Sequence, residues 1–329
     1  MIVATAPGRV NLIGEHTDHT GGLALPLAVD LGTTVELEPG GDTVVLRSDD
    51  EPEPAVVALD IEDPAAVEPA WARYVAGVVA ELRPSVGGTG TVRTTLPIGA
   101  GLSSSAALEV AVALALGFDG PPVDLALVCQ RAEQRSSGVP SGVLDQLASA
   151  AGVAGSALLL DCTTLDVRPV PLPADLAVVV VDSGQRRTLA GSAYAERRAQ
   201  CEAAEREVGP LRSATADDVA GIGDPVLQRR ARHVVTENAR VRAFVDALER
   251  DDRPALGRLL DESHASLRDD FEVSTDVLDA LVDRLRRIPG VHGARMMGGG
   301  FGGAAVALAD PGALDEGWTV TAVEGARRR

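Results

Sequence analysis

A polar stretch near the start of the chain, Gly8–Gly22, groups residue types that could bind a small polar ligand. It reads GRVNLIGEHTDHTGG and places Arg9, Glu15, His16 and Asp18 close together between glycines. The aliphatic residues among them should draw the segment into the core, where charged groups need partners. We therefore expect it to form the wall of a polar pocket, with a solvated charged loop as the alternative.

A second stretch, Pro97–Leu108, reads PIGAGLSSSAAL and could bind a phosphate. Its glycines allow close backbone approach to a ligand, and its serines offer hydroxyls and amides where an apolar helix begins. Helix N-termini attract anions because their first N–H groups are unpaired and carry partial positive charge. The alternative is a capped core helix after a tight turn. The chain has no lysine, so a Gly-Lys-Ser/Thr phosphate loop is excluded, and the serines do not form a Gly-x-Ser-x-Gly nucleophile elbow.

The elements that must position these stretches follow from apolar periodicity and from turn residues. We expect an early antiparallel sheet, an exposed acidic connection over Asp49–Pro69, and a mainly helical second half. Strands are expected at 2–6, 23–29, 33–37, 43–47, 89–95, 157–160, 167–170, 176–182 and 304–309. Helices are expected at 71–82, 106–116, 123–134, 143–151, 192–208, 227–248, 253–268 and 275–287. This mixture predicts an α+β fold in two domains, residues 1–172 and 173–329.

A glycine-rich stretch, Met296–Gly303, formally contains the G-x-G-x-x-G pattern of dinucleotide-binding folds. The residues after it, Ala304–Ala309, are typical of a strand rather than a helix, and too little chain follows for a βαβ unit. We therefore reject a dinucleotide fold and expect a glycine hairpin packed tightly against another element or a ligand.

Composition limits the classes of partner and compartment. The net charge of −18 argues against nucleic acid and anionic membranes as partners. Three widely spaced cysteines suggest neither a disulfide framework nor a zinc site. We find no signal-peptide pattern and no apolar run long enough to span a bilayer, so a cytoplasmic location is expected.

Taken together and in this order, these motifs resemble the GHMP small-molecule kinases, and Gly8–Asp18 resembles the galactokinase branch in particular. The resemblance runs from Arg9 to Gly303 and implies the two-domain GHMP architecture, with an N-terminal domain like domain 2 of ribosomal protein S5, a ferredoxin-like C-terminal α/β sandwich, and the active site between them. The further matching stretches are Gly142–Gln146, Tyr194–Cys201 (YAERRAQC), Arg232–Asn238 (RHVVTEN) and Ser263–Phe271 (SHASLRDDF).

The resemblance also implies a role for each matching residue in an ATP- and Mg²⁺-dependent kinase, expected to act as a monomer on the anomeric hydroxyl of galactose. Asp145 would act as the base or position the hydroxyl, with Arg9 beside it. Ser105 and Glu133 would hold Mg²⁺. The sugar would be bound by Glu15, His16, Thr17, Asp18, Gly142 and Tyr194. The ATP phosphates would be cradled by Gly99, Ala100, Gly101, Leu102, Ser103, Ser104, Ser105 and Ala106.

Several positions depart from the family pattern and leave the sugar open. His19 stands where the family usually has tyrosine, Ser141 replaces a frequent cysteine, Met297 a common threonine, and Ser183–Arg187 lacks the usual Asn and His. None of these changes removes a proposed catalytic group. The alternatives are a kinase for arabinose, galacturonate or galactosamine, and a catalytically silent sensor of sugar and ATP.

Overall fold

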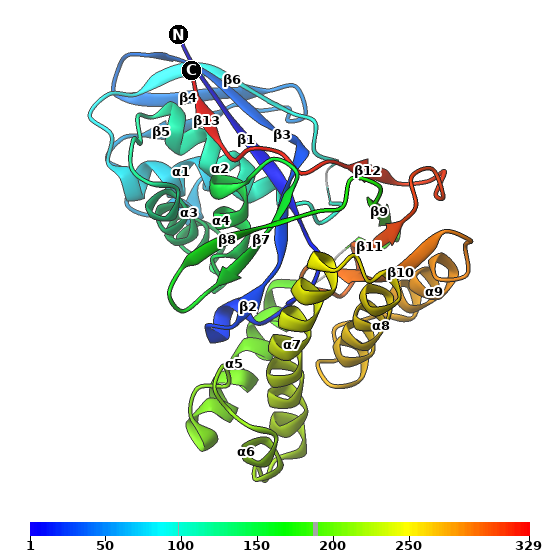
Figure 1. Ribbon diagram of the computed structural model, residues 1–329. Coiled ribbons are helices and arrows are strands. Elements are labelled where there is room, and N and C mark those ends of the chain that lie inside the picture. Colours follow the sequence, from blue (N-terminus) through cyan, green and yellow to red (C-terminus); the bar gives the residue numbers. More distant parts are fainter. Residues whose placement is uncertain (98, 187–189) are drawn as a thin grey trace.

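The protein, described by a computed structural model over residues 1–97, 99–186 and 190–329, is built on two main sheets with helices packed against them (Figure 1). Residue 98 of the glycine-serine loop and Arg187 of the departing SGQRR segment lie outside the described residues. The mixed strands and helices confirm the predicted α+β class.

The first sheet has six strands in the order β13-β1-β3-β6-β4-β5, antiparallel except for the β4–β6 pair. Helices from the same half of the chain pack against it (Figure 1). The strands are β1 (Ile2–Asn11), β3 (Pro26–Pro39), β4 (Thr43–Ser48), β5 (Ala55–Ala58), β6 (Gly88–Thr94) and β13 (Arg327–Arg328). The helices are α1 (Ala72–Leu82), α2 (Ser104–Ala115), α3 (Pro122–Ser137) and α4 (Leu144–Ala151), with 3-10 turns η1 (Asp18–Thr20) and η2 (Pro64–Ala66).

A three-stranded sheet and a four-stranded sheet complete the fold. The smaller one contains β2 (Leu23–Ala24), β7 (Ser156–Asp161) and β8 (Asp166–Pro171). The larger one, in the order β10-β11-β9-β12, contains β9 (Ala177–Asp182), β10 (Val291–Met297), β11 (Ala304–Ala309) and β12 (Trp318–Val320). Its neighbours are α8 (Arg253–Asp269) and α9 (Asp276–Leu285), while α5 (Ala190–Val208), α6 (Ala216–Ala220) and α7 (Pro225–Glu249) form a projecting helical arm (Figure 1).

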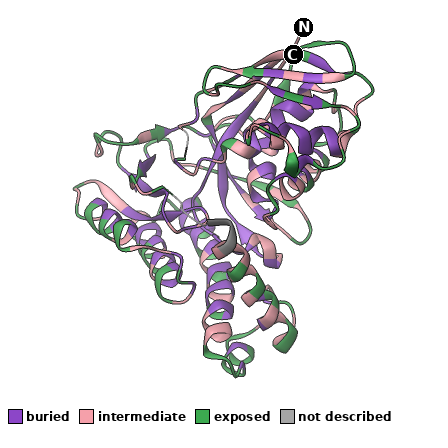
Figure 2. Cartoon of the chain, turned by 180° about the vertical axis from the view of Figure 1, so that it is seen from behind, coloured by how far each residue is buried: buried purple, intermediate pink, exposed green. Residues whose placement is uncertain are grey.

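One apolar core continues from the end of the six-stranded sheet into the four-stranded sheet. Val10 of β1 and Leu12, just after β1, belong to the same buried cluster as Val178 and Val306 of the four-stranded sheet. Figure 2 shows this continuity as buried strands between exposed outer helix faces. The last strand, β13, pairs with β1, so the chain end returns to the first sheet. The division at 172/173 stays a prediction.

The sequence underestimated the length of two strands and missed several short elements, among them β5, α6 and β12. β1 continues through Pro7 and Gly8 because a bulge between Pro7 and Arg9 absorbs the irregularity. β3 continues through Asp30–Gly32, where the exposed Asp30 carboxylate accepts a hydrogen bond from the Thr321 amide at 2.9 Å. The expected connection Asp49–Pro69 contains β5 and η2. None of the helices in the described residues combines the length and the apolar character needed to cross a bilayer.

Candidate active site

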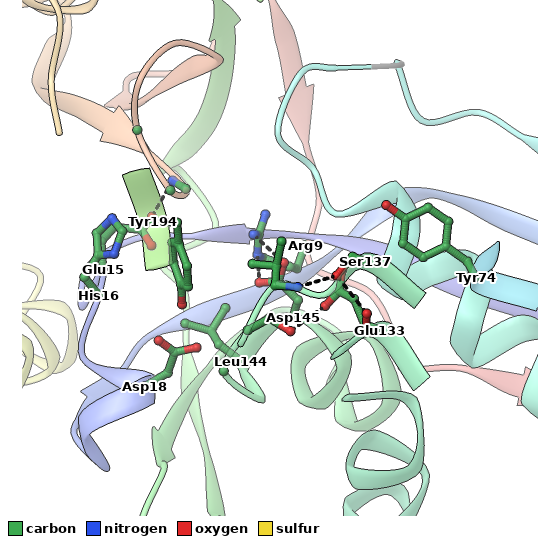
Figure 3. A pocket seen from close by; sticks show the side chains of 16 residues that line it. Arg9, Glu15, His16, Asp18, Tyr74, Glu133, Ser137, Leu144, Asp145 and Tyr194 are labelled. Carbon is green, nitrogen blue, oxygen red and sulfur yellow. Dashed lines mark hydrogen bonds and ion pairs between the residues drawn. The ribbon is translucent and has the colours of Figure 1, made fainter. Parts of the chain in front are cut away.

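A cavity of about 360 Å³ collects most of the predicted site residues (Figure 3). Asp145 and Arg9 lie in its middle, with Glu15, His16, Asp18 and Tyr194 toward one end and Glu133 and Tyr74 toward the other. The other lining residues are Ser137, Val139, Ser141, Gly142, Leu144, Gly298, Gly299 and Gly300. The residues thus come from both halves of the chain.

Asp145, in the first turn of α4, is held by two side chains. Arg9 donates to both of its carboxylate oxygens, from Nε at 2.7 Å and from Nη2 at 2.8 Å. The hydroxyl of Ser103 donates to Oδ2. The β1 bulge positions Arg9, because after it the Arg9 amide donates to the Leu102 carbonyl at 3.1 Å while Nη1 donates to the Gly101 carbonyl at 2.6 Å. One arginine therefore joins the carboxylate to the glycine-serine loop.

The glycine-serine loop turns sharply into α2. Gly99 and Gly101 have φ of 85° and 74°, and Ser103 is also left-handed with φ of 58°. Ser103 does not cap the helix with its side chain, contrary to the ordinary role of serine at this position, because its hydroxyl is bound to Asp145. The loop leads directly into the α2 N-terminus, the part of a helix that attracts phosphate.

Glu133, on α3, is surrounded by hydrogen-bond donors. Ser105 Oγ donates to Oε1 at 3.0 Å, while Ser141 Oγ and Gln146 Nε2 both donate to Oε2 at 2.9 Å. Burial, followed by the nearby Asp145 charge, raises the pKa of Glu133, and these hydrogen bonds oppose the rise. Ser141, where the family often has cysteine, thus donates a hydrogen bond to Glu133, the carboxylate expected to hold the metal.

The Ser105 and Glu133 oxygens fit a hard cation such as Mg²⁺, which prefers oxygen ligands and keeps water and phosphate in its shell. No cluster of three or more His, Cys, Asp or Glu residues suited to a metal occurs in the described residues.

At the opposite end, Glu15 is fixed by the glycine hairpin between β10 and β11. Its Oε1 accepts from the Gly298 amide at 2.7 Å and from Arg295 Nη2 at 3.3 Å. Arg295 is fully buried and also donates to the carbonyls of Leu12 at 2.6 Å and Asn11 at 2.7 Å. The hairpin and β10 thus contact the Gly8–Gly22 stretch through a backbone amide and through the Arg295 side chain.

Asp18 packs against Gly142, and its carboxylate is close enough to Asp145 for the two negative charges to repel each other. A Cβ on Gly142 would collide with the Asp18 carboxylate, so the absence of a side chain there makes room for Asp18. Burial, followed by the Asp145 charge, raises the pKa of Asp18 from 3.8 to about 6. Burial lowers the pKa of the neighbouring His19 to about 3, and the His19 ring meets Tyr194 edge-on with centroids 5.9 Å apart.

Aromatic rings close this end of the cavity. His16 stacks between Tyr194, at 5.5 Å, and Phe271, at 4.6 Å between ring centroids. Burial, followed by the Asp18 charge, raises the pKa of Tyr194 well above its ordinary value, so its hydroxyl keeps its proton. Thr17 is not among the cavity-lining residues, because its hydroxyl is bonded to the carbonyls of Gly14 and Leu23 at 3.0 and 2.7 Å.

A second cavity of about 270 Å³ is lined in part by the first residues of α2 and was not predicted from the sequence. Ser104, Ser105, Trp71 and Tyr74 are among its lining residues, and Tyr74 lines both cavities. The one available signal was Trp71, one of only two tryptophans in a chain with 2% aromatic residues. Of residues 99–106, which the structure describes, only Ser104 and Ser105 line one of these two cavities. Arg295 was also missed, because β10, the buried strand that carries it, was not among the expected strands.

Family models match three segments of the chain: a galactokinase galactose-binding signature over residues 1–39, a GHMP kinase N-terminal domain over 73–153, and a GHMP kinase C-terminal domain over 244–318. A galactokinase of Chloroflexus aurantiacus is 44% identical over 93% of this chain and 83% of its own length. The chain belongs to the galactokinase branch of the GHMP kinases. A galactokinase of Roseiflexus is 42% identical over 95% of this chain and 85% of its own length.

Solved structures agree with this membership of the galactokinase branch. The structure of Lactococcus lactis galactokinase complexed with galactose matches with a TM-score of 0.91 and 32% identity, over 99% of this chain and 95% of that one. The mevalonate kinase of L. major matches with a TM-score of 0.67 at 20% identity, over 97% of this chain and 95% of that one, which shows the shared GHMP fold. As a kinase of this family, the protein uses ATP.

Proposed function

We propose that this galactokinase family member transfers the γ-phosphoryl group of ATP to the anomeric C1 hydroxyl of D-galactose, giving galactose 1-phosphate. The observation that carries the proposal is the Asp145 carboxylate, clamped by Arg9 and Ser103 in the middle of one cavity. The galactose signature at residues 1–39 and the relatives named galactokinase support the choice of sugar.

In this proposal, the acidic and aromatic end of the cavity binds the sugar. Glu15, Asp18 and the Tyr194 hydroxyl offer acceptors and a donor for sugar hydroxyls, with His16 packed among the aromatic rings. Thr17 supports the loop through its two backbone contacts rather than touching the sugar directly. Gly142 leaves the room that Asp18 occupies.

Asp145 would accept the proton of the C1 hydroxyl while the oxygen of that hydroxyl forms a bond to the γ-phosphorus. At the same time, the bond between the γ-phosphorus and the β,γ-bridging oxygen breaks, and ADP leaves. The guanidinium of Arg9 holds both oxygens of the Asp145 carboxylate and places positive charge beside the transferring group. The transfer passes through a loose transition state, so alignment by these fixed side chains is the main contribution of the protein.

The phosphates would lie on the loop Gly99–Ala106 and the α2 N-terminus, with the nucleoside toward the cavity lined by Trp71 and Tyr74. Mg²⁺, held by Ser105 and Glu133, would neutralise charge on the β- and γ-phosphates. We also propose that the protein acts as a monomer. Dependence on ATP, abundant in the cytoplasm, supports a cytoplasmic location.

The test is ADP release by the purified protein with Mg²⁺ and ATP, with galactose, arabinose, galacturonate, galactosamine, glucose or no sugar. Highest kcat/KM on galactose, with the product carrying phosphate on C1 by ³¹P NMR, is the expected result. Turnover on another sugar alone would move the specificity to that sugar. Absence of turnover on all of them, with intact ATP binding, would favour a sensor.

A further inference from the structure

A buried carboxyl group, Glu109, lies directly behind the proposed metal residues without lining either cavity. It is the single charged residue of α2, whose sequence is SSAALEVAVALA, and none of its surface is exposed. Four residues after Ser105, it lies on the same helix face, one turn farther into the protein. A carboxyl group in such a position costs stability unless it is hydrogen-bonded, so it needs a structural reason.

The partner of Glu109 is the side-chain amide of Gln146. Its Nε2 donates to Glu109 Oε2 at 3.1 Å and to Glu133 Oε2 at 2.9 Å. An amide nitrogen carries two hydrogens, so each of these bonds uses one of them. The bridge ties α2, α3 and α4 together at the ends that carry Ser105, Glu133 and Asp145.

We propose that Glu109 is a positioning residue, which acts through Gln146 to hold the Glu133 carboxylate beside Ser105. With both glutamates as acceptors, the Gln146 amide is fixed from two directions, and Glu133 in turn has a fixed donor on Oε2. Loss of the Glu109 acceptor would leave the amide free to rotate away from Glu133. This inference rests on the metal role proposed for Ser105 and Glu133.

Two further atoms fit the pairing of Glu109 with Gln146. Glu109 Oε1 and Gln146 Oε1 are both buried and have no hydrogen-bond partner in the part of the chain that the structure describes. A carboxylic acid and an amide can form two reciprocal hydrogen bonds, which would satisfy both atoms. Burial, followed by the Glu133 charge, raises the pKa of Glu109 well above its ordinary value, in agreement with a neutral acid.

The experiment measures metal affinity without turnover. Mn²⁺ replaces Mg²⁺, the ATP analogue AMPPNP replaces ATP, and free Mn²⁺ is followed by electron paramagnetic resonance. Glu109→Met, which removes the acceptor at similar volume, should weaken Mn²⁺ binding about tenfold, as expected for a residue that orients a ligand. Glu109→Gln retains an acceptor oxygen and should restore binding to within about twofold of the unmodified protein.

A matched control separates positioning from general loss of stability. Val110, the next residue of α2, is buried and apolar, so Val110→Ala should lower the melting temperature and leave Mn²⁺ affinity unchanged. If Glu109→Met does not fold, Glu109→Asp, shorter by one methylene, should give the same loss of affinity. Unchanged affinity in either folded variant, or failure of Glu109→Gln to restore it, overturns the proposal.

Glu133→Gln distinguishes failure of this inference from failure of the metal site itself. If Glu133→Gln leaves Mn²⁺ affinity unchanged, the assignment of Glu133 as a metal residue is wrong, and the positioning role of Glu109 falls with it. If Glu133→Gln weakens binding and Glu109→Met does not, only the positioning role is overturned.

Discussion

Replacement of Asp145 by asparagine tests the center of the proposed mechanism with little change in shape. Arg9 donates to the two carboxylate oxygens at 2.7 and 2.8 Å. An asparagine presents one oxygen and one NH₂ group to the same fork, so one of the two bonds is lost and two donors face each other. The variant also loses the group that would accept the proton of the sugar hydroxyl.

The size of the effect follows from these contacts. Loss of a positioned base lowers rates by about 100- to 10,000-fold. This corresponds to about 3 to 5 kcal/mol in activation free energy. Arg9 has only 8% of its side-chain surface exposed, so leaving it half-paired costs about 1 to 3 kcal/mol of folding stability. Activity must therefore be measured well below the melting temperature of the variant.

The assay is steady-state ADP release with saturating galactose and ATP, alongside nucleotide affinity by calorimetry. Asp145→Asn should lose most of kcat and bind nucleotide nearly as before. Because Arg9 and Asp145 act as one unit, adding Arg9→Met to Asp145→Asn should lower kcat little further. A fall in kcat smaller than about tenfold in the folded Asp145→Asn variant would refute the role of Asp145 as base.

Two further predictions concern the sugar end of the cavity. Since the pKa of Asp18 is raised from 3.8 to about 6, the native state holds a proton there that the unfolded chain releases, and stability should fall by up to about 3 kcal/mol as pH rises from 4 to 6. Denaturant unfolding of Asp18→Asn should lack this slope; an identical slope in both proteins would contradict the assignment. Gly142→Ala should raise KM for galactose at least about tenfold with little change in KM for ATP, because the new Cβ displaces the Asp18 carboxylate. Gly223→Ala is the control, since nothing lies within 4 Å of a Cβ there, and equal sugar KM values in the two variants would count against the packing argument.

Local patterns in the sequence predicted most helices and several strands to within a few residues. The apolar helices and the strand after the glycine hairpin are of this kind, because their periodicity and bounding turns are local properties. The continuous β1 and β3 strands were not predictable, since Gly8 and Asp30 break the local pattern and are accommodated only by a bulge and by a contact with Thr321. Short elements such as β5 carry too little pattern to be found.

The sequence by itself determined which residues could do chemistry: a carboxylate and an arginine, a glycine-serine loop at a helix start, and a polar motif between glycines. These are matters of residue type and spacing, and they are sufficient to recognise the family. Only the tertiary structure decided which of these groups meet. Arg9 and Asp145 are 136 positions apart, and the hairpin amide of Gly298 reaches Glu15 across 283. Such pairings depend on how sheets and helices pack, and no local pattern encodes them, which is why Arg295 and the Glu109–Gln146 bridge became visible only in the folded chain.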